Sequence, residues 1–317
     1  MSLKKKISNF LKPNYSTLNC GFMINTYRFV VSGTRGIFAG GNTGVSVNTM
    51  DYITIETVGN AIDFGDLTDT SNIGAGCSDR SRGCHAIGNG GGGISNVINY
   101  VTIGTIGNAS TFGNLTVARN NLGGCASDTR GCFGGGDTGS DSNVIDYITI
   151  ATTGNATDFG DLSGTRRAVT ALSDWTTRGV WAGGATALST MEYITIASTG
   201  NATNFGNLTV GRRSCSTVAS ETRGVIAGGA DAVHDPQNVI DYITIATTGN
   251  ATDFGDLTRS NQQICGVSSF TRGCFGGGTP TTNIIDYITI ATTGNATDFG
   301  DLTSSRSGMA LTGMSGS

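Results

Sequence analysis

A unit of about 50 residues occurs six times in this chain of 317 residues, and no other feature constrains the fold as strongly. Each unit is marked by the arginine of a Thr-Arg-Gly or Ser-Arg-Gly step and by the tyrosine of a later Ile-Asp-Tyr-Ile-Thr-Ile run or a variant of it. The arginines are Arg35, Arg82, Arg130, Arg178, Arg223 and Arg272, and the tyrosines are Tyr52, Tyr100, Tyr147, Tyr193, Tyr242 and Tyr287. Successive markers of either kind are 45 to 49 residues apart. A fixed period of this length is typical of solenoids, propellers and other repeat arrays.

Within one unit the apolar residues recur with period two, which predicts strands rather than helices. In the unit that begins at Arg166 we expect four short strands, at residues 168–173, 179–184, 191–196 and 203–208. The third strand is rich in the β-branched and aromatic residues that suit a pleated surface. Four antiparallel strands per unit, with glycine at the turns, describe a propeller blade. The sequence therefore predicts an all-β, six-bladed β-propeller.

The order of features within a unit resembles the kelch repeat. The second strand ends in a glycine pair, an aromatic residue follows in the third strand, and an arginine opens the next unit. The glycine pairs are Gly40-Gly41, Gly135-Gly136, Gly183-Gly184, Gly228-Gly229 and Gly277-Gly278, with Gly90 to Gly93 in the second unit. One departure is that phenylalanine replaces the tryptophan usual in the fourth kelch strand, at Phe64, Phe112, Phe159, Phe205, Phe254 and Phe299. The resemblance covers roughly residues 20 to 317.

The run Tyr-Ile-Thr-Ile-Ala-Thr-Thr-Gly-Asn-Ala-Thr-Asp-Phe-Gly-Asp-Leu also looks like the repeat of kelch-like proteins encoded by marine bacteriophages. That resemblance implies a virion structural protein of a tail, fibre or capsid decoration, with other virion proteins as partners. It also implies a place in the virion after synthesis in the host cytoplasm, because the N-terminus lacks the long apolar stretch of a secretory signal peptide.

The first 20 residues form a basic N-terminal arm, ahead of a propeller over residues 21–317 with units that start near residues 34, 81, 129, 177, 222 and 271. The arm contains all four lysines, Lys4, Lys5, Lys6 and Lys12. The rest of the chain has 15 arginines against 23 acidic residues, so its charge is near −8. A basic arm on an acidic body is a solvated tail or a docking arm for an acidic partner. The acidic body disfavours nucleic-acid binding, and no apolar run is long enough for membrane insertion.

The end of the chain repeats the start of a unit, which bears on how the ring closes. We expect Gly308 to Thr312 to form a first strand beside Gly36 to Ala39 in the first blade. The competing closure uses Phe29 to Ser32 for that strand. Both closures leave six blades and avoid an exposed strand edge.

The loops fall into two classes on the two faces of the propeller. The turns between strands one and two and between strands three and four lie on one face and are nearly identical between units. The loops between strands two and three lie on the other face and vary in length and composition. Binding residues tend to sit on loops carried by a rigid scaffold, so we nominate Asn42, Asn89, Asp137, Asp141, Thr186, Asp231, His234, Asp235 and Thr281 as candidate binding residues. The alternative is that nothing constrains these loops.

Residues suited to catalysis or metal binding are scarce. Histidine occurs only at His85, in a strand position that other units fill with Phe, Trp or Ile, and at His234, in the longest loop. We expect His85 to be a packed core residue, and a metal at His234 would need more ligands than its neighbours Asp231 and Asp235 supply. The sequence therefore predicts no catalytic residue, no metal and no cofactor.

Two further recurring residue types have structural explanations. The acids of the Asp-Phe-Gly-Asp-Leu segment exchange with asparagine between units, as at Asp158 and Asn204, which suits Asx-turns and disfavours catalysis or calcium binding. We expect the arginine of each Thr-Arg-Gly step to donate to backbone carbonyls or to these side chains, with a ring of phosphate-binding arginines as the alternative.

Eight cysteines include three pairs on the first and second strands of one unit: Cys77/Cys84, Cys125/Cys132 and Cys265/Cys274. These pairs are candidates for cross-strand disulfides, but small buried apolar residues are favoured because valine, alanine and isoleucine occupy comparable positions. Cys20 and Cys215 lack an obvious partner.

These observations together predict a non-enzymatic virion protein that acts as a protein-interaction or host-adhesion scaffold. The alternative is a lectin-like propeller with one shallow glycan site per blade. An enzyme with a site near His85 or His234 is the third hypothesis.

Overall fold

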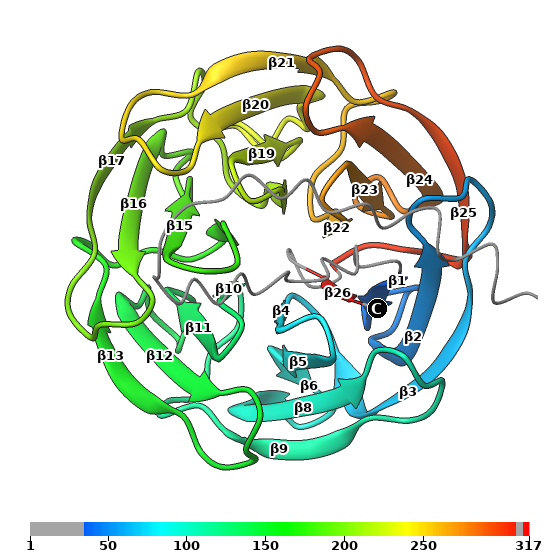
Figure 1. The fold of residues 1–317 in the computed structure, drawn as a ribbon. Helices are drawn as coiled ribbons and strands as arrows, with labels where there is room; N and C mark the ends of the chain where they lie inside the picture. Colours follow the sequence, from blue (N-terminus) through cyan, green and yellow to red (C-terminus); the bar gives the residue numbers. More distant parts are fainter. Residues whose placement is uncertain (1–34, 309–312, 317) are drawn as a thin grey trace, which may run out of the picture. The chain divides into compact units, whose positions relative to one another are not determined.

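The computed structural model describes residues 35–308 and 313–316. These residues form six four-stranded antiparallel sheets around one axis, with no helix among them (Figure 1). The predicted six-bladed β-propeller is therefore confirmed. The basic arm and the Phe29–Ser32 segment lie outside the described residues.

We number the blades 1 to 6 along the chain. Blade 1 contains β26 (Met314–Gly316), β1 (Arg35–Ala39), β2 (Val47–Thr54) and β3 (Ile62–Ser71). Blade 2 contains β4 (Ala75–Ser78), β5 (Arg82–Ala86), β8 (Val97–Thr102) and β9 (Ser110–Asn114), and a small hairpin of β6 (Asn89–Gly90) and β7 (Gly93–Ile94) leaves it. Blade 3 contains β10 (Gly123–Ala126), β11 (Arg130–Gly134), β12 (Val144–Thr149) and β13 (Thr157–Asp161).

Blades 4 to 6 repeat the same strand order. Blade 4 contains β14 (Thr170–Ser173), β15 (Arg178–Ala182), β16 (Thr190–Thr195) and β17 (Thr203–Asn207). Blade 5 contains β18 (Ser216–Ala219), β19 (Arg223–Ala227), β20 (Val239–Thr244) and β21 (Thr252–Asp256). Blade 6 contains β22 (Cys265–Ser268), β23 (Arg272–Gly276), β24 (Thr282–Thr289) and β25 (Thr297–Arg306). The four strands of blade 4 agree with their predicted ranges to within two residues at each end.

The ring closes through the C-terminal end of the chain. Strand β26 pairs with β1, with Gly316 opposite Arg35 and Met314 opposite Ile37. Closure by the C-terminal segment was predicted correctly, but the strand is Met314–Gly316 and not Gly308–Thr312. Gly308 has a φ of +60° and takes the place of Ile73, which precedes β4 with a φ of +50°. The segment from Gly308 to β26 is two residues longer than its counterpart before β4, so the strand lies further along the chain.

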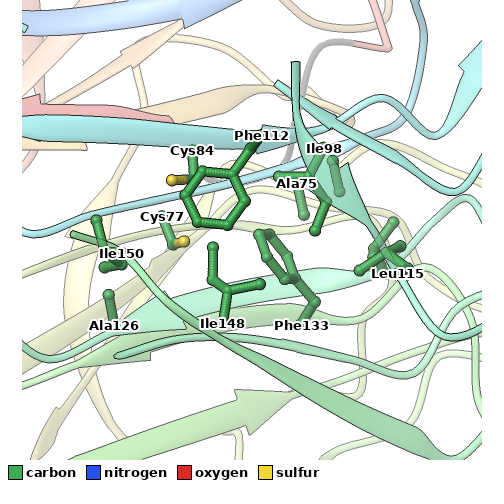
Figure 2. Packing of buried hydrophobic residues seen from close by; sticks show 12 residues of the cluster. Ala75, Cys77, Cys84, Ile98, Phe112, Leu115, Ala126, Phe133, Ile148 and Ile150 are labelled. Atoms are coloured by element: carbon green, nitrogen blue, oxygen red, sulfur yellow. The ribbon is translucent and has the colours of Figure 1, made fainter. Parts of the chain in front are cut away.

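The hydrophobic core lies between neighbouring blades. In one cluster Phe112 and Cys77 of blade 2 pack with Phe133 and Ile148 of blade 3, and all four are at most 4% exposed (Figure 2). The fourth-strand phenylalanine of every blade contacts the third-strand tyrosine edge to face, with ring centroids 6.0 to 6.1 Å apart. Each blade therefore buries its faces against its neighbours, as in other repeat architectures.

The arginine of each Thr-Arg-Gly or Ser-Arg-Gly step joins its own blade to the next one. The Arg178 guanidinium lies 4.3 Å from the centre of the Tyr193 ring in the same blade, and its Nη1 donates to the carbonyl of Ile245 in blade 5 at 2.8 Å. The same pair of contacts occurs at Arg35, Arg82, Arg130, Arg223 and Arg272. The expected bonds to backbone carbonyls are therefore confirmed, and they occupy these arginines in the fold.

A second set of arginines makes buried ion pairs across the blade junctions. Arg212 follows β17, and its Nη2 lies 2.6 Å from the carboxylate of Asp241 on β20, with both side chains fully buried. Equivalent pairs are Arg119–Asp146, Arg166–Glu192 and Arg306–Asp51, and Arg259–Asp286 is a longer and more exposed variant. Because the desolvation of such charges is costly, each pair needs both partners.

The junction between blades 1 and 2 has neutral residues where the others have an ion pair. Ser71 replaces the arginine and Asn99 replaces the carboxylate. Asn99 Oδ1 accepts hydrogen bonds from the backbone N–H and hydroxyl of Thr68, at 2.8 and 2.9 Å. His85 is 1% exposed, and its Nε2 lies 2.7 Å from Ser71 Oγ, which donates to the carbonyl of Ile87. His85 is thus the packed core residue that the sequence predicted, in a junction that has lost both charges together.

The seven cysteines of the described chain are buried free thiols. Cys77 lies opposite Cys84 and Cys125 lies opposite Cys132, as expected for residues that face across two strands. The third pair is different, because Cys265 lies opposite Gly276 and Cys274 lies opposite Val267. Cys274 occupies the position of Cys84, whereas Cys265 lies two residues before the position of Cys77, which Val267 fills. Burial raises the pKa of Cys215 to about 11, so its thiol stays protonated and unreactive at neutral pH.

Candidate functional site

A small cavity lies at the axis of the propeller, between the innermost strands of the described residues. Its volume is about 60 Å³, and residues of the innermost strands such as Cys77, Cys125, Thr217 and Gly266 line it. Ligand pockets usually have volumes of about 300–1,000 Å³. The axial cavity therefore has room for a few water molecules and none for an organic substrate.

An aromatic cluster lies on the strand-one to strand-two turns near the axis. The Arg80 guanidinium lies 5.1 Å from the ring centre of Trp175 and 4.7 Å from that of Phe270, and the two rings are 4.8 Å apart. Asp128 lies 3.8 Å from Arg80. The four residues of this cluster lie at positions that vary between otherwise uniform turns. This variation was the sequence signal that could have identified the cluster.

The nominated residues at the start of the variable loops shape their own loops. Asn42 Oδ1 accepts from the N–H of Gly44 at 2.7 Å, and Asp137 Oδ1 accepts from that of Gly139 at 2.8 Å. Asp231 Oδ1 accepts from the backbone N–H groups of Val233 and Asp235, each at 2.9 Å. These are Asx-turns, so the three side chains already have a structural use.

Two other nominated residues contact the segment that links neighbouring blades. Asp141 forms a 2.8 Å ion pair with Arg167, which also lies 3.5 Å from Asp137. Asn89 accepts a hydrogen bond from Asn120 Nδ2 at 2.7 Å. The structure thus brings Asp137 and Asp141 together through Arg167.

The remaining nominated residues do not form one cluster. Thr186 and His234 have φ angles of +66° and +73°, and Thr281 is exposed. His234 and Asp235 are exposed in the same loop, but no group of three or more His, Cys, Asp or Glu side chains in residues 35–308 and 313–316 is placed to hold a metal.

Exposed aliphatic side chains on the variable face were missed by the sequence prediction. Val45 is 70% exposed and Val233 is 80% exposed, and Ile94 in a third loop is 41% exposed. Val117 and Val210, in the links to the next blades, are also exposed on this face. The residues nominated from the sequence were all polar.

Recurring hollows lie on the opposite face, beside the turn that joins the third and fourth strands. We call them turn pockets. In blade 5 this pocket has a volume of about 360 Å³ and is lined by Tyr242, Thr247, Thr248, Asn250 and Thr252 among others. Equivalent pockets in blades 1, 3 and 6 have volumes of about 260, 360 and 330 Å³. The sequence prediction placed its candidate binding residues on the variable loops and nominated none in these turns.

The asparagine of the turn holds neighbouring blades together. Asn250 Oδ1 accepts from the backbone N–H of Asn207 in blade 4 at 3.0 Å, and the same bond recurs at the other five junctions. The acids of the Asp-Phe-Gly-Asp-Leu segment instead lie on the outermost strand, where the first is exposed, as at Asp158 and Asp253, and the second is half-buried, as at Asp161. The Asx-turn prediction for these acids was therefore wrong, because an extended strand and not a turn contains them.

Comparison with models of known protein families finds no matching family, and a search of curated proteins finds no match. Within the part of the chain that the structure describes, no helix has the length and apolar character needed to cross a membrane. The resemblance to kelch and bacteriophage repeats therefore stays a prediction from the sequence.

Proposed function

We propose that this propeller is a non-enzymatic structural component of a bacteriophage particle, where it serves as a scaffold for protein interaction or host adhesion. The observation that carries the proposal is the use of its recurring charged groups. The arginines that contact tyrosine and the buried ion pairs all join one blade to the next, as at Arg178 and Arg212. The resemblance of the repeat to phage proteins supplies the viral context and the virion as its location.

The variable face supports the docking of other virion proteins. It exposes Val45, Val233 and Ile94 on loops that differ from blade to blade. Loops that vary in sequence on a rigid scaffold suit a protein contact. The basic arm, with Lys4 and its neighbours, remains the predicted second contact.

Mass spectrometry of purified particles tests this proposal. We expect the chain at a fixed copy number in particles purified through a density gradient, and antibody labelling at one location in electron micrographs. A chain that is abundant in the infected-cell lysate and missing from pure particles would rule out the virion role.

The turn pockets favour a second candidate function, the binding of a host-surface glycan. Pockets of similar size occur at equivalent positions in four blades. One weak site per blade gives strong total binding when the ligand is itself a repeating chain. A glycan array probed with the full chain tests this function. If the chain bound no glycan, even at millimolar ligand concentration, this function would be rejected.

A further inference from the structure

The turn pockets combine an aromatic ring of fixed orientation with uncharged hydrogen-bonding groups. In blade 5 the Tyr242 ring is held between the Arg223 guanidinium, 4.4 Å from its centre, and the edge-to-face ring of Phe254, at 6.1 Å. Tyr242 is half-buried, whereas Thr248 and Thr252 are exposed beside it. A rigid wall of this kind reduces the entropy lost when a ligand binds.

The amide of the turn asparagine is oriented before any ligand arrives. Asn250 Oδ1 accepts from the N–H of Asn207, which leaves the two N–H donors of Nδ2 for another partner. Asn155 and Asn295 make the same bond, to Asn114 and Asp256, in the pockets of blades 3 and 6.

The fold itself does not need the threonine hydroxyls of these pockets. Val58 and Ile62 stand in blade 1 where Thr248 and Thr252 stand in blade 5. The strand pairing beside the turn is the same in both, with Tyr52 opposite Ile62 and Tyr242 opposite Thr252. The side-chain hydroxyls of Thr248 and Thr252 form no hydrogen bond within the described part of the chain. Hydroxyls that the turn does not require can bind a ligand in place of water.

The pocket lining limits the chemistry of that ligand. No charged side chain is among the residues that line the pockets of blades 3, 5 and 6, and the nearby arginine of each blade already contacts the tyrosine ring and a backbone carbonyl of the next blade. Their volumes of 330 to 360 Å³ are at the small end of the usual range for ligand sites. An aromatic wall with hydroxyl and amide groups at its edge suits one small ring that is apolar on its face and rich in hydroxyls on its rim.

We propose that the turn pockets of blades 3, 5 and 6 each bind one neutral sugar ring of a repeating polysaccharide, and that Val58 and Ile62 exclude it from blade 1. This inference rests on the glycan-binding function proposed above and specifies its sites. It places recognition on the face with uniform turns, opposite the loops that the sequence nominated.

Substitution with residues that the chain itself contains at the same position tests the sites. The triple variant Thr157→Ile, Thr252→Ile and Thr297→Ile introduces the residue found at Ile62 into three blades. The control is the same triple change to serine, the residue at Ser110 in blade 2, which keeps the hydroxyl. Binding of neutral polysaccharides and of the methyl glycosides of glucose, galactose, mannose and N-acetylglucosamine is measured by glycan array and by titration NMR. Urea unfolding curves check that each variant folds.

We expect the isoleucine variant to lose about tenfold or more of its affinity for a polysaccharide, because avidity multiplies the loss at each site. The serine variant keeps the affinity of the original chain. The double change Val58→Thr and Ile62→Thr adds one site per chain. Equal binding by all variants would overturn the assignment of sites while the glycan function stands. Binding of acidic glycans alone would overturn the neutral sugar, and no glycan binding at all would reject both the sites and the function.

Discussion

Single residues at the blade junctions decide how much charge the propeller buries. Arg212 has two further bonds besides its ion pair with Asp241, to the carbonyls of Gly228 at 2.7 Å and Val239 at 2.6 Å. A buried arginine that meets all of these partners fixes one blade against the next. The junction with Ser71 and Asn99 joins its two blades without charged residues. This indicates that the arginine and its carboxylate partner must be present together or absent together.

Removal of one member of the Arg212–Asp241 pair should therefore destabilise the protein more than removal of both members. We expect Arg212→Ser to lower the free energy of unfolding by about 3–5 kcal/mol, because Asp241 is left buried without a counter-ion. The double variant Arg212→Ser and Asp241→Asn reproduces the neutral junction and should be less destabilised than Arg212→Ser alone. Urea denaturation of the three proteins measures this. Equal loss in the single and double variants would contradict the argument.

His85 gives the neutral junction a dependence on pH. Burial lowers its pKa to about 4 from the ordinary value of 6.5, so the unfolded chain binds a proton more readily than the folded one below pH 6.5. Stability from this residue is complete above pH 6.5 and is lost as the pH falls towards 4, by about 2 kcal/mol between pH 7 and pH 5. The variant His85→Phe introduces the residue found at the same position in other blades, as Phe38 and Phe133. In this variant the difference between the free energies of unfolding at pH 7 and pH 5, measured with urea, should be smaller by about 2 kcal/mol. An unchanged difference would show that other groups cause the acid sensitivity.

At the scale of the strand, the glycine after each Thr-Arg or Ser-Arg step lets neighbouring blades approach. A Cβ on Gly224 of β19 would lie 2.6 Å from Leu172 Cδ1 of β14, and one on Gly83 would lie 2.6 Å from Met314 Sδ of β26. Side chains of the innermost strand of one blade thus fill the space that these glycines leave in the next blade. This contact explains why the glycine recurs in all six units.

We expect Gly224→Ala to destabilise the protein by about 1–3 kcal/mol, because the close contact forces strain into a packed interface. Gly164 is a matched control, since a Cβ there would meet no atom within 4 Å. Gly164→Ala should change the free energy of unfolding by less than about 0.5 kcal/mol. Thermal and urea unfolding compare the two variants. Equal effects would mean that loss of glycine flexibility, and not contact with Leu172, decides the result.

At the scale of the whole molecule, the period and alternation of the sequence were enough to predict six four-stranded blades. They were enough because every blade packs against its neighbours through nearly the same residues. Features that depend on contacts between distant units could not be read from one unit. The neutral junction at His85 and the position of β26 each depend on a partner from another unit, whereas the pairing of Cys265 with Gly276 depends on the register of one local turn. The turn pockets were not identified because the candidate binding residues were chosen from the variable loops.

Blade 1 differs from the other blades in two features, although its junction with blade 6 keeps the buried Arg306–Asp51 ion pair. Within the blade, β26 is a strand of three residues that pairs with β1 without a connecting turn, and at the junction with blade 2 neutral residues replace an ion pair. Local opening follows such weak contacts.

We therefore expect the backbone amides of β1 and β2 to exchange with deuterium faster than those of β15 and β16 in native buffer. The triple variant Ser71→Arg, Asn99→Asp and His85→Phe restores the junction found elsewhere. It should slow exchange in blades 1 and 2 without changing blade 4. Blades held by contacts of equal strength open with equal probability. Equal exchange rates in all six blades would therefore mean that the closing strand and the neutral junction are as strong as the other contacts.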